Sequence, residues 1–394
     1  MSSDGSNANY ISMTSNGHET TDGAGTNAKG NGVAGMPSKP VAHSFTHDIV
    51  TMEWMKVPSS SFKMLMGPIL LWGLWHLCLP DRPNPFSYLL YISHKLPDSS
   101  ESDPRYAKGY GDLAFLAYYV IVFSFIRQFI TIHILRPFAY SQGIRKEGKL
   151  DRFAEQGYAV IYYGFFGLTG VYVMSTLPTW WFKTDPIFLE YPQWRLQPQL
   201  KLYYLLQLSY WIQQLAILTL RLEKPRKDFQ ELVYHHLVTL WLIGWSYLIN
   251  FVYIGNLVFV TMDVSDIFLA FAKCLRYLDY ENGSAVAFAV FVCVWTYLRH
   301  WLNLVLLYDI WTGFDKMPEW SRVWNPSEGI WMVWWMKWQV IGALGFLQGL
   351  NLFWYFYIWR ILIRAVFTSN LDDERSDDED EGEPEANGKK DKAE

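Results

Sequence analysis

The chain has 394 residues, of which 51% are hydrophobic and 18% aromatic, and its formal net charge is −5. This composition is typical of a polytopic membrane protein with soluble ends, and the acidic balance gives no sign of a nucleic-acid partner. Three cysteines, Cys78, Cys274 and Cys293, all lie in apolar stretches, which argues against a disulfide framework.

Both ends of the chain are predicted to be disordered cytosolic tails. Residues 1–45 are mainly Ser, Gly, Asn and Thr, so they bury too little apolar surface to offset chain entropy, and they do not resemble a signal peptide. Residues 367–394 are acidic. The stretch 372–394 holds twelve acidic and four basic residues, a net charge of −8 against −5 for the whole chain, so the remaining residues carry +3.

Two short signals lie in the acidic tail. Ser376 precedes Asp377, Asp378 and Glu379, a pattern that fits an acid-directed kinase, although a solvated acidic tail explains it equally well. Lys390 and Lys392 stand fifth and third from the end, where a dilysine retrieval signal of the endoplasmic reticulum would place them.

Eight segments between the tails are predicted to cross the membrane, because about twenty apolar residues span ~30 Å of hydrocarbon as a helix. Two further stretches, 85–92 and 331–338, are interpreted as half-buried or interfacial helices. The first two spans belong to an N-terminal segment, residues 46–149, and the last six to a domain at 150–366. We place the spans near 62–80, 112–136, 155–177, 201–221, 232–253, 255–277, 285–311 and 338–364.

The orientation follows from the loop charges, because loops rich in Lys and Arg stay in the cytosol. Basic residues follow the second, fourth and eighth spans, and an even number of spans leaves both termini in the cytosol. The first connection is an exception, since it carries Arg82, Lys95, Arg105 and Lys108. The residues that set the orientation are Arg136, Arg145, Lys146, Lys149, Arg152, Arg221, Lys224, Arg226, Lys227, Arg360 and Arg364.

Four ionisable residues lie within these apolar spans: His235, His236, Asp263 and Asp266. Each such group costs at least ~2.5–3.5 kcal/mol near the bilayer centre, so a chemical role is expected. The histidines lie one turn inside the cytosolic end of the fifth span, roughly 5–7 Å deep at 1.5 Å per residue. The carboxylates are three residues apart near the middle of the sixth span, which puts them on one helix face.

Further polar residues are predicted to line the same cavity. Lys273 continues the carboxylate face toward the cytosol, and the seventh span offers Arg299, His300 and Asn303. Gln214 either lines the cavity or forms interhelical hydrogen bonds. Asp266 either acts on a substrate or pairs structurally with Arg299. The residues that we expect to bind substrate are Ser265, Arg299, Asn303, Tyr247, Lys273 and Gln214.

The residue types leave four interpretations open. Two histidines and two carboxylates suit zinc or iron, but adjacent histidines point about 100° apart on a helix, so we expect no metal. A di-iron desaturase would need several His clusters. A proton or ion pathway suits intramembrane Asp and His, although no internal repeat is visible. The others are acyl transfer with one histidine as base or nucleophile, and a buried network that only fixes helix packing.

The sequence around these residues resembles the longevity-assurance motif of ceramide synthases. The similarity lies in residues 234–239 (Tyr-His-His-Leu-Val-Thr) and 261–266 (Thr-Met-Asp-Val-Ser-Asp), with Lys273 and Tyr277 after them. It extends over the domain that these enzymes share with translocation-associated membrane proteins, roughly residues 150–366. The fungal enzymes are the most similar, because Met262 stands where animal members usually carry His and the chain ends in an acidic tail.

The resemblance implies that the chain joins a fatty acyl group from acyl-CoA, a co-substrate, to the amine of dihydrosphingosine or phytosphingosine, without a cofactor. It implies a six-helix barrel of spans three to eight around the active site, in the endoplasmic reticulum membrane. Similar fungal enzymes use very long acyl groups and work with a small single-spanning subunit and a ceramide synthase paralogue. The alternatives are a non-catalytic lipid-sensing or translocon-associated member of the same family and a proton-coupled transporter.

Two routes to the amide are open. One histidine acts as a general base while the amine attacks the thioester, or His235 attacks first and forms an acyl-imidazole. Resemblance to membrane elongases with paired histidines favours the second route, with His236 orienting His235 or acting as a base. Asp263 and Asp266 would orient an imidazole or bind the sphingoid ammonium. Arg221, Arg226 and Lys227 would attract the CoA phosphates, although retention of positive loops in the cytosol explains them as well.

The predicted orientation has a direct test at Asn282, which begins the acceptor sequon Asn282-Gly283-Ser284. This sequon lies in a connection that we place in the cytosol, so Asn282 should carry no glycan. Treatment with an endoglycosidase should leave the electrophoretic mobility of the membrane-extracted protein unchanged. A mobility shift that disappears in Asn282→Gln would overturn the orientation.

Overall fold

The computed structural model describes residues 44–222 and 227–368. The chain divides into two units, 1–39 and 40–394, and the described residues all belong to the second. The predicted tails at 1–45 and 367–394 lie almost entirely outside the described residues, as do Lys224, Arg226, Ser376 and the dilysine signal.

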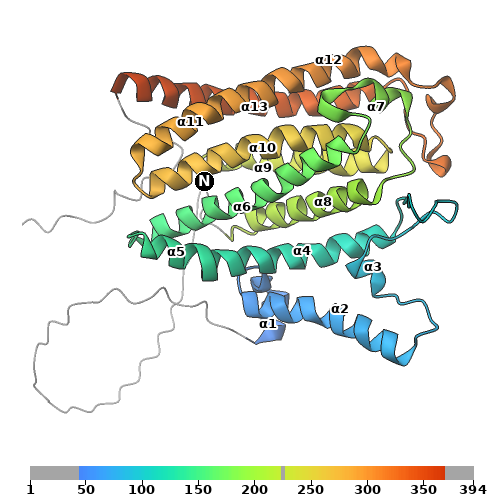
Figure 1. Ribbon diagram of the computed structural model, residues 1–394, viewed down its shortest axis with the longest axis horizontal. Coiled ribbons are helices and arrows are strands. Elements are labelled where there is room, and N and C mark those ends of the chain that lie inside the picture. The colour runs from blue at the N-terminus through green and yellow to red at the C-terminus, as the bar shows by residue number, and fades with distance from the viewer. Residues whose placement is uncertain (1–43, 223–226, 369–394) are drawn as a thin grey trace, which may run out of the picture. The chain divides into compact units, whose positions relative to one another are not determined.

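The described residues form helices joined by loops and three isolated β-bridges (Figure 1). The long helices are α2 (Pro58–Cys78), α4 (Gly111–Ile130), α6 (Glu147–Ser175), α8 (Pro198–Thr219), α9 (Phe229–Leu248), α10 (Val252–Tyr277), α11 (Glu281–Trp295), α12 (Asn303–Gly313) and α13 (Met336–Thr368). The short ones are α1 (Phe45–Val50), η1 (Glu53–Met55), α3 (Ser87–Leu90), α5 (Arg136–Ser141), η3 (Trp180–Phe182), α7 (Asp185–Leu189), η5 (Phe314–Lys316), η6 (Glu319–Ser321) and η7 (Pro326–Glu328).

Every predicted span overlaps at least one helix, although the bounds differ by several residues. Five helical segments are long and apolar enough to cross a membrane: Gly111–Ser141, Glu147–Ser175, Val252–Tyr277, Glu281–Lys316 and Met336–Ala365. The prediction of a polytopic helical membrane protein is therefore confirmed. The helices α2, α8 and α9 have the length but not the apolar composition, so eight crossings stay a prediction.

The predictions of two interfacial helices have different outcomes. The stretch 85–92 contains the one-turn helix α3, as predicted. The interpretation of 331–338 as a helix is wrong, because its first five residues are extended or in a turn and α13 begins only at Met336. The tryptophans at 331, 334 and 335 lie in an aromatic-rich loop before α13. A loop can carry such residues without helical periodicity.

Two membrane helices contain a π-helical stretch. In the first, η2 (Thr131–Leu135) joins α4 to α5, and Pro137 follows it. Proline has no backbone N–H and its ring clashes with the carbonyl four residues earlier, which accounts for the wider turn. In the second, η4 (Thr296–Leu302) joins α11 to α12 without a nearby proline. Such wide turns are frequent at functional sites.

Within the described residues, six helical segments contact one another in a closed order when α11, η4 and α12 are counted as one segment. Helix α6 packs on α10, α10 on α11, and η4 and α12 on α13. The order continues from α13 to α9, from α9 to α8, and from α8 back to α6. Outside this ring, α4 packs on α8 and α2 packs on α4 (Figure 1).

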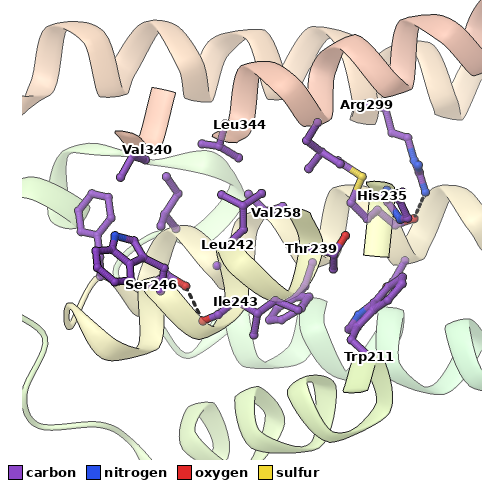
Figure 2. Close-up of a pocket in the computed structure, with 18 of the residues that line it drawn as sticks. Trp211, His235, Thr239, Leu242, Ile243, Ser246, Val258, Arg299, Val340 and Leu344 are labelled. Atoms are coloured by element: carbon purple, nitrogen blue, oxygen red, sulfur yellow. Dashed lines mark hydrogen bonds between the residues drawn. The ribbon is translucent and has the colours of Figure 1, made fainter. Parts of the chain in front are cut away.

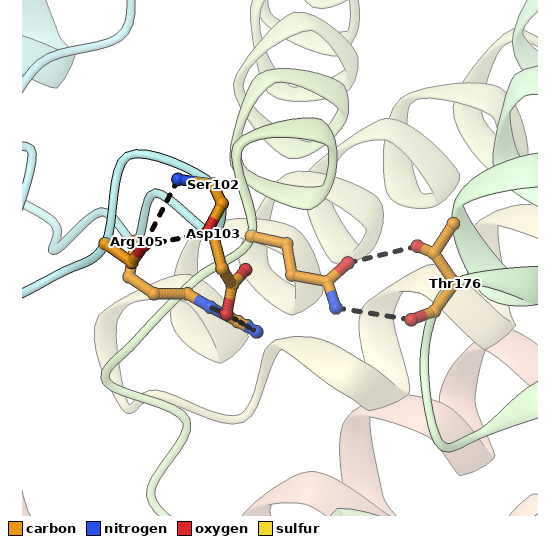
Figure 3. Close-up of polar contacts among 6 residues, drawn as sticks. Ser102, Asp103, Arg105 and Thr176 are labelled. Atoms are coloured by element: carbon orange, nitrogen blue, oxygen red, sulfur yellow. Dashed lines mark hydrogen bonds and ion pairs between the residues drawn. The ribbon is translucent and has the colours of Figure 1, made fainter.

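Loops at the predicted non-cytosolic end are held by polar contacts. Gln197, just before α8, exchanges two hydrogen bonds with Thr176, just after α6: its amide donates to the Thr176 carbonyl at 3.2 Å and accepts from the hydroxyl at 3.1 Å. Nearby, Arg105 pairs with Asp103 at 2.8 Å (Figure 3). The two hydrogen bonds between Gln197 and Thr176 fix the start of α8 relative to the end of α6.

A buried ion pair attaches the N-terminal segment to the ring. Asp112 on α4 lies 2.8 Å from the ammonium of Lys201 on α8, and both side chains are almost fully buried. The Asp112 carboxylate also accepts from the Tyr247 hydroxyl at 2.8 Å and from the Gly109 amide at 2.9 Å. The Lys201 ammonium donates to the carbonyls of Ser93 and Ala107 as well. One carboxylate thus joins α4, α8 and α9.

Removing the Asp112 charge should destabilise the protein strongly. Asp112→Asn leaves the buried Lys201 ammonium without its counter-ion, and breaking a buried pair typically costs ~3–5 kcal/mol. We expect a clear fall in the melting temperature of the detergent-solubilised protein. The control is Asp98→Asn, which breaks the exposed pair with Arg195 and should leave the melting temperature unchanged. Equal effects in the two variants would contradict this assignment.

Candidate active site

His235 and His236 lie two turns into α9, and both side chains are buried. His236 is fixed by its own helix, because its Nδ1–H donates to the Leu232 carbonyl at 2.7 Å. The Nε2 atom of a neutral His236 therefore carries the lone pair. His235 has no such anchor, and its Nδ1 is buried without a hydrogen-bond partner among the described residues.

Two tryptophans hold the His235 ring in place. Trp211 on α8 and Trp354 on α13 contact it at edge-on angles, with ring centroids 5.7 Å and 5.4 Å away. Trp211 also contacts the His236 ring at 5.4 Å. The Trp354 indole N–H donates to Asp228 just before α9, at 3.3 Å. His235 is thus positioned by aromatic packing from both neighbouring helices of the ring.

Asp263 on α10 is fully buried in a network with α8 and α6. One carboxylate oxygen accepts from the Gln207 amide, whose nitrogen also contacts the Tyr203 hydroxyl at 3.0 Å. The Gln207 carbonyl accepts from Tyr162 at 2.7 Å. The second Asp263 oxygen, Oδ1, is buried with no partner among residues 44–222 and 227–368.

Arg299, on the π-helical stretch η4, binds the second carboxylate. Its Nη2 lies 2.6 Å from Asp266 Oδ1 and 3.0 Å from the Met262 carbonyl. Its Nε donates to Ser265 at 2.6 Å and its Nη1 to Asn351 at 3.3 Å. The guanidinium also lies 4.1 Å from the centre of the Trp295 ring. The pairing of Asp266 with Arg299, considered from the sequence, is confirmed.

Two cavities meet at these residues. The inner one is mainly apolar, has a volume of about 60 Å³, and follows α9 from His235 to Ile249 between α10 and α13 (Figure 2). The outer one is more polar, with apolar side chains in its lining as well, has a volume of about 280 Å³, and includes Arg127, Arg152 and Lys273 in its wall. Both cavities share Trp211, His235, Asp266 and Arg299. The catalytic candidates therefore lie where an apolar space joins a polar one.

The structure separates the predicted site residues into two groups. His235, Asp266 and Arg299 line both cavities, Asp263 lines the inner one, and His236, Lys273 and Gln214 line the outer one. The others do not line either cavity. Ser265 accepts from Arg299, Tyr247 donates to Asp112, and Asn303 donates to Gln348, whose amide also contacts His300.

Four residues at the site were not predicted from the sequence. Gln207, Trp211, Trp354 and Asn351 contact the histidines, Asp263 or Arg299 from other helices. A signal existed for Gln207, which is seven residues before Gln214 and so lies on the same helix face. A tryptophan inside a membrane span carries no such signal, because aromatic residues are common there.

That no metal binds at the paired histidines stays a prediction. Within the described residues, one group of three side chains places potential ligand atoms within 4.8 Å of one another: His47, Asp48 and Glu53, near the start of α2. No such group includes His235 or His236. The centroids of the two imidazole rings lie 5.7 Å apart, and the ring planes are at 89° to each other.

Comparison with known proteins identifies relatives over most of the chain. Residues 152–360 match the model of the TLC domain. Sphingosine N-acyltransferase lac1 of Schizosaccharomyces pombe is 38% identical over 325 residues, 82% of this chain and 83% of the relative. Ceramide synthase LAG1 of Saccharomyces cerevisiae is 39% identical over 311 residues, 79% of this chain and 74% of the relative. Sphingosine N-acyltransferase-like protein FUM17 of Gibberella moniliformis is 40% identical over 274 residues, 69% and 70% of the two chains.

Proposed function

This chain belongs to the TLC-domain family of fungal ceramide synthases, and we propose that it transfers a fatty acyl group from acyl-CoA to the amine of a sphingoid base. The names of its relatives support ceramide synthesis. The acyl donor and the roles of individual residues are proposed from the site.

The observation that carries the proposal is the set of polar atoms without partners at the cavity junction. Among the described residues, His235 Nδ1, Asp263 Oδ1 and Trp211 Nε1 are buried and have no hydrogen-bond partner. A polar network that only fixes helix packing would be satisfied internally, because an unpaired buried polar group costs ~1–3 kcal/mol. His235, Asp263 and Trp211 line the cavities, so a substrate that enters can supply partners to these groups when their side chains turn toward it.

The two cavities match the two parts of an acyl-CoA. The inner cavity runs beside α9 from His235 to Ile249, just after the end of the helix, and these fourteen steps along the chain are roughly 21 Å at 1.5 Å per residue. Its apolar lining suits the carbon chain of an acyl group. The outer cavity contains Arg127, Arg152 and Lys273, whose charges suit phosphate groups. The thioester would then lie beside His235.

We propose the route through an acyl-imidazole. A His235 nitrogen attacks the thioester carbon, the C–S bond breaks, and the thiolate takes the imidazole proton and leaves as CoA. The deprotonated sphingoid amine then attacks the acyl-imidazole, and the C–N bond to the imidazole breaks as the amide forms. His236 Nε2 or the free oxygen of Asp263 takes the proton of the sphingoid ammonium before the attack, and the second proton that the nitrogen loses goes to His235 as the C–N bond breaks, which regenerates the neutral imidazole.

The Arg299–Asp266 pair would position the acceptor. Asp266 keeps one oxygen on Arg299 and reaches both cavities, so its charge suits the sphingoid ammonium. The closed order of α6, α10, α11–α12, α13, α9 and α8 supports the proposed six-helix barrel around this site. Loop charges and family membership support an endoplasmic reticulum membrane location with cytosolic termini. A small single-spanning subunit and a second ceramide synthase chain remain proposed partners.

His235→Ala and Asp266→Ala should each abolish ceramide formation. The first removes the nucleophile and the second removes the carboxylate that binds the amine and holds Arg299. Purified variants are tested with dihydrosphingosine and a panel of acyl-CoAs, and their folding is checked by membrane insertion and melting temperature. His133→Ala, an exposed histidine on η2, is the control and should stay active. Full activity in His235→Ala would refute the assignment.

The two routes differ in the absence of a sphingoid base. Acyl-CoA alone should release about one equivalent of CoA per active site and leave an acyl group on His235, because the covalent step precedes amine entry. Free thiol and intact-protein mass report the two products. Wild-type protein that makes ceramide but releases no CoA without base would favour direct attack by the amine.

A further inference from the structure

Three side chains with metal-binding atoms lie together at the N-terminal end of the described residues. His47 and Asp48 on α1 and Glu53 on η1 each place one potential ligand atom within 4.8 Å of the others. His47 Nδ1 lies 3.8 Å from Glu53 Oε2. Two atoms that are both bonded to a zinc ion at about 2.1 Å can be at most ~4.2 Å apart. The side chains of His47 and Glu53 are 50% and 39% exposed, so they have room to complete this geometry.

Asp48 is the member of the group that lacks a cation. Its side chain is fully buried, and Oδ2 accepts a hydrogen bond from the Ser60 hydroxyl of α2. Oδ1 has no hydrogen-bond partner, and no Lys or Arg among the described residues forms an ion pair with this carboxylate. Buried charges in proteins are paired or coordinate a metal, because an isolated charge is very costly away from water. Asp112 follows this rule with Lys201 as its partner.

The burial of Oδ1 is compatible with an ion, although it excludes a water molecule. A hydrogen-bonded water would lie about 2.8 Å from the oxygen, whereas a zinc ion would lie about 2.1 Å from it. An ion between Asp48, His47 and Glu53 therefore needs less space than a water molecule in the same place. It would also supply the missing cation.

Helix α1 has few other contacts that could hold it. It has six residues, and Asp48 is its one buried residue. Isolated helices shorter than ~12–15 residues are marginal in water, so α1 needs tertiary support. The helix lies against η1 and α2 (Figure 1), and the ammonium of Lys63 lies 5.6 Å from the centre of the Phe45 ring. An ion shared between α1 and η1 would attach the short helix.

The turn between α1 and η1 brings the third ligand back to the first two. Met52 has φ 61° and ψ 15°, the left-handed conformation that favours glycine. A residue with a side chain keeps this conformation only where the surrounding structure requires it. The reversal at Met52 places Glu53 beside His47, and it also buries the next two residues, Trp54 and Met55.

We propose that His47, Asp48 and Glu53 bind a zinc ion that holds the N-terminal segment against the ring of helices. The two carboxylates carry two negative charges, which a divalent ion neutralises, and imidazole with carboxylate oxygens is a donor set that zinc accepts. A water molecule would complete a tetrahedral site. The role is structural, because the buried residues that follow the site pack with Ile217 of α8, which lines the outer cavity.

The test measures zinc in the full-length protein, purified in detergent without a polyhistidine tag and dialysed against a weak chelator. Wild-type protein should retain about one zinc ion per chain. Asp48→Asn keeps the shape of the side chain and an acceptor for Ser60, but removes the charge. Its zinc affinity, measured by competition with a chromophoric chelator, should fall at least about tenfold, since even changes around metal ligands cost 10–100-fold.

Two further variants guard against loss of the fold in Asp48→Asn. His47→Gln and Glu53→Gln change half-exposed side chains, and each should also weaken zinc binding at least about tenfold. Matched controls are His133→Gln and Asp98→Asn, which change exposed residues outside the group and should keep the wild-type zinc affinity.

A second readout reports what the ion holds. Addition of Zn²⁺ to metal-free wild-type protein should slow amide hydrogen exchange in residues 45–55, because local opening becomes less frequent when the ligands are joined. Residues 336–368 of α13 are the internal control and should exchange at an unchanged rate. No such protection is expected in Asp48→Asn. Adventitious zinc at the surface would bind without protecting residues 45–55, which would overturn the proposal.

The remaining outcomes are equally decisive. Wild-type protein that holds no zinc and takes up none would overturn the site, and His47 and Glu53 would then form only an ion pair. One equivalent of a different metal would overturn the assignment to zinc, and wild-type affinity in all three ligand variants would place the ion elsewhere. Neither readout depends on ceramide formation, so failure of the zinc site and failure of the proposed function are separate results.

Discussion

The ion pair between Arg299 and Asp266 is the interaction on which the site depends. Each charge alone would cost at least ~2.5–3.5 kcal/mol at membrane depth, and the pair is tolerated because the guanidinium is satisfied on every side. Ser265, Asn351 and the Met262 carbonyl complete its contacts. These partners come from α10 and α13, so the pair also fixes the spacing of the helices that enclose the inner cavity. A positive charge is thereby held where the two cavities meet.

Most helices were predictable from hydropathy, and the polar residues of α8 and α9 explain why these two helices are less apolar than the other spans. Helices α8 and α9 are less apolar than the other spans because they carry Gln207, Gln213, Gln214, His235 and His236, all buried or lining a cavity. In these two helices, the glutamines and histidines that lower the hydropathy of the span are therefore also residues of the interior. Helix ends were less predictable, since α6 begins at Glu147, eight residues before the predicted span. Charged residues extend a helix beyond the hydrocarbon without an apolar signal.

Within the site, spacing on one helix was predictable and contacts between helices were not. Asp263 and Asp266 line the inner cavity together, as three-residue spacing requires. His300 and Asn303 do not join Arg299 there, and both contact Gln348 instead. His300 is adjacent to Arg299 and would point about 100° away from it in a regular helix as well, whereas between Arg299 and Asn303 the π-helical η4 replaces the 3.6-residue period. A local sequence pattern cannot report such a change of register.

The arrangement of the two cavities also affects the lifetime of the proposed acyl-imidazole. Such an intermediate is open to hydrolysis, so the proposed reaction needs a site that admits an amine and excludes water. The walls around His235 are the rings of Trp211 and Trp354, and beyond them the inner cavity is lined by residues such as Leu242, Val258 and Leu344. An acyl chain in that space would displace water from the side of His235 that faces the carbonyl. Polar access remains from the outer cavity, past His236 and Lys273, where CoA would leave. Separation of apolar and polar space at one histidine therefore supplies both protection of the intermediate and a path for the leaving group.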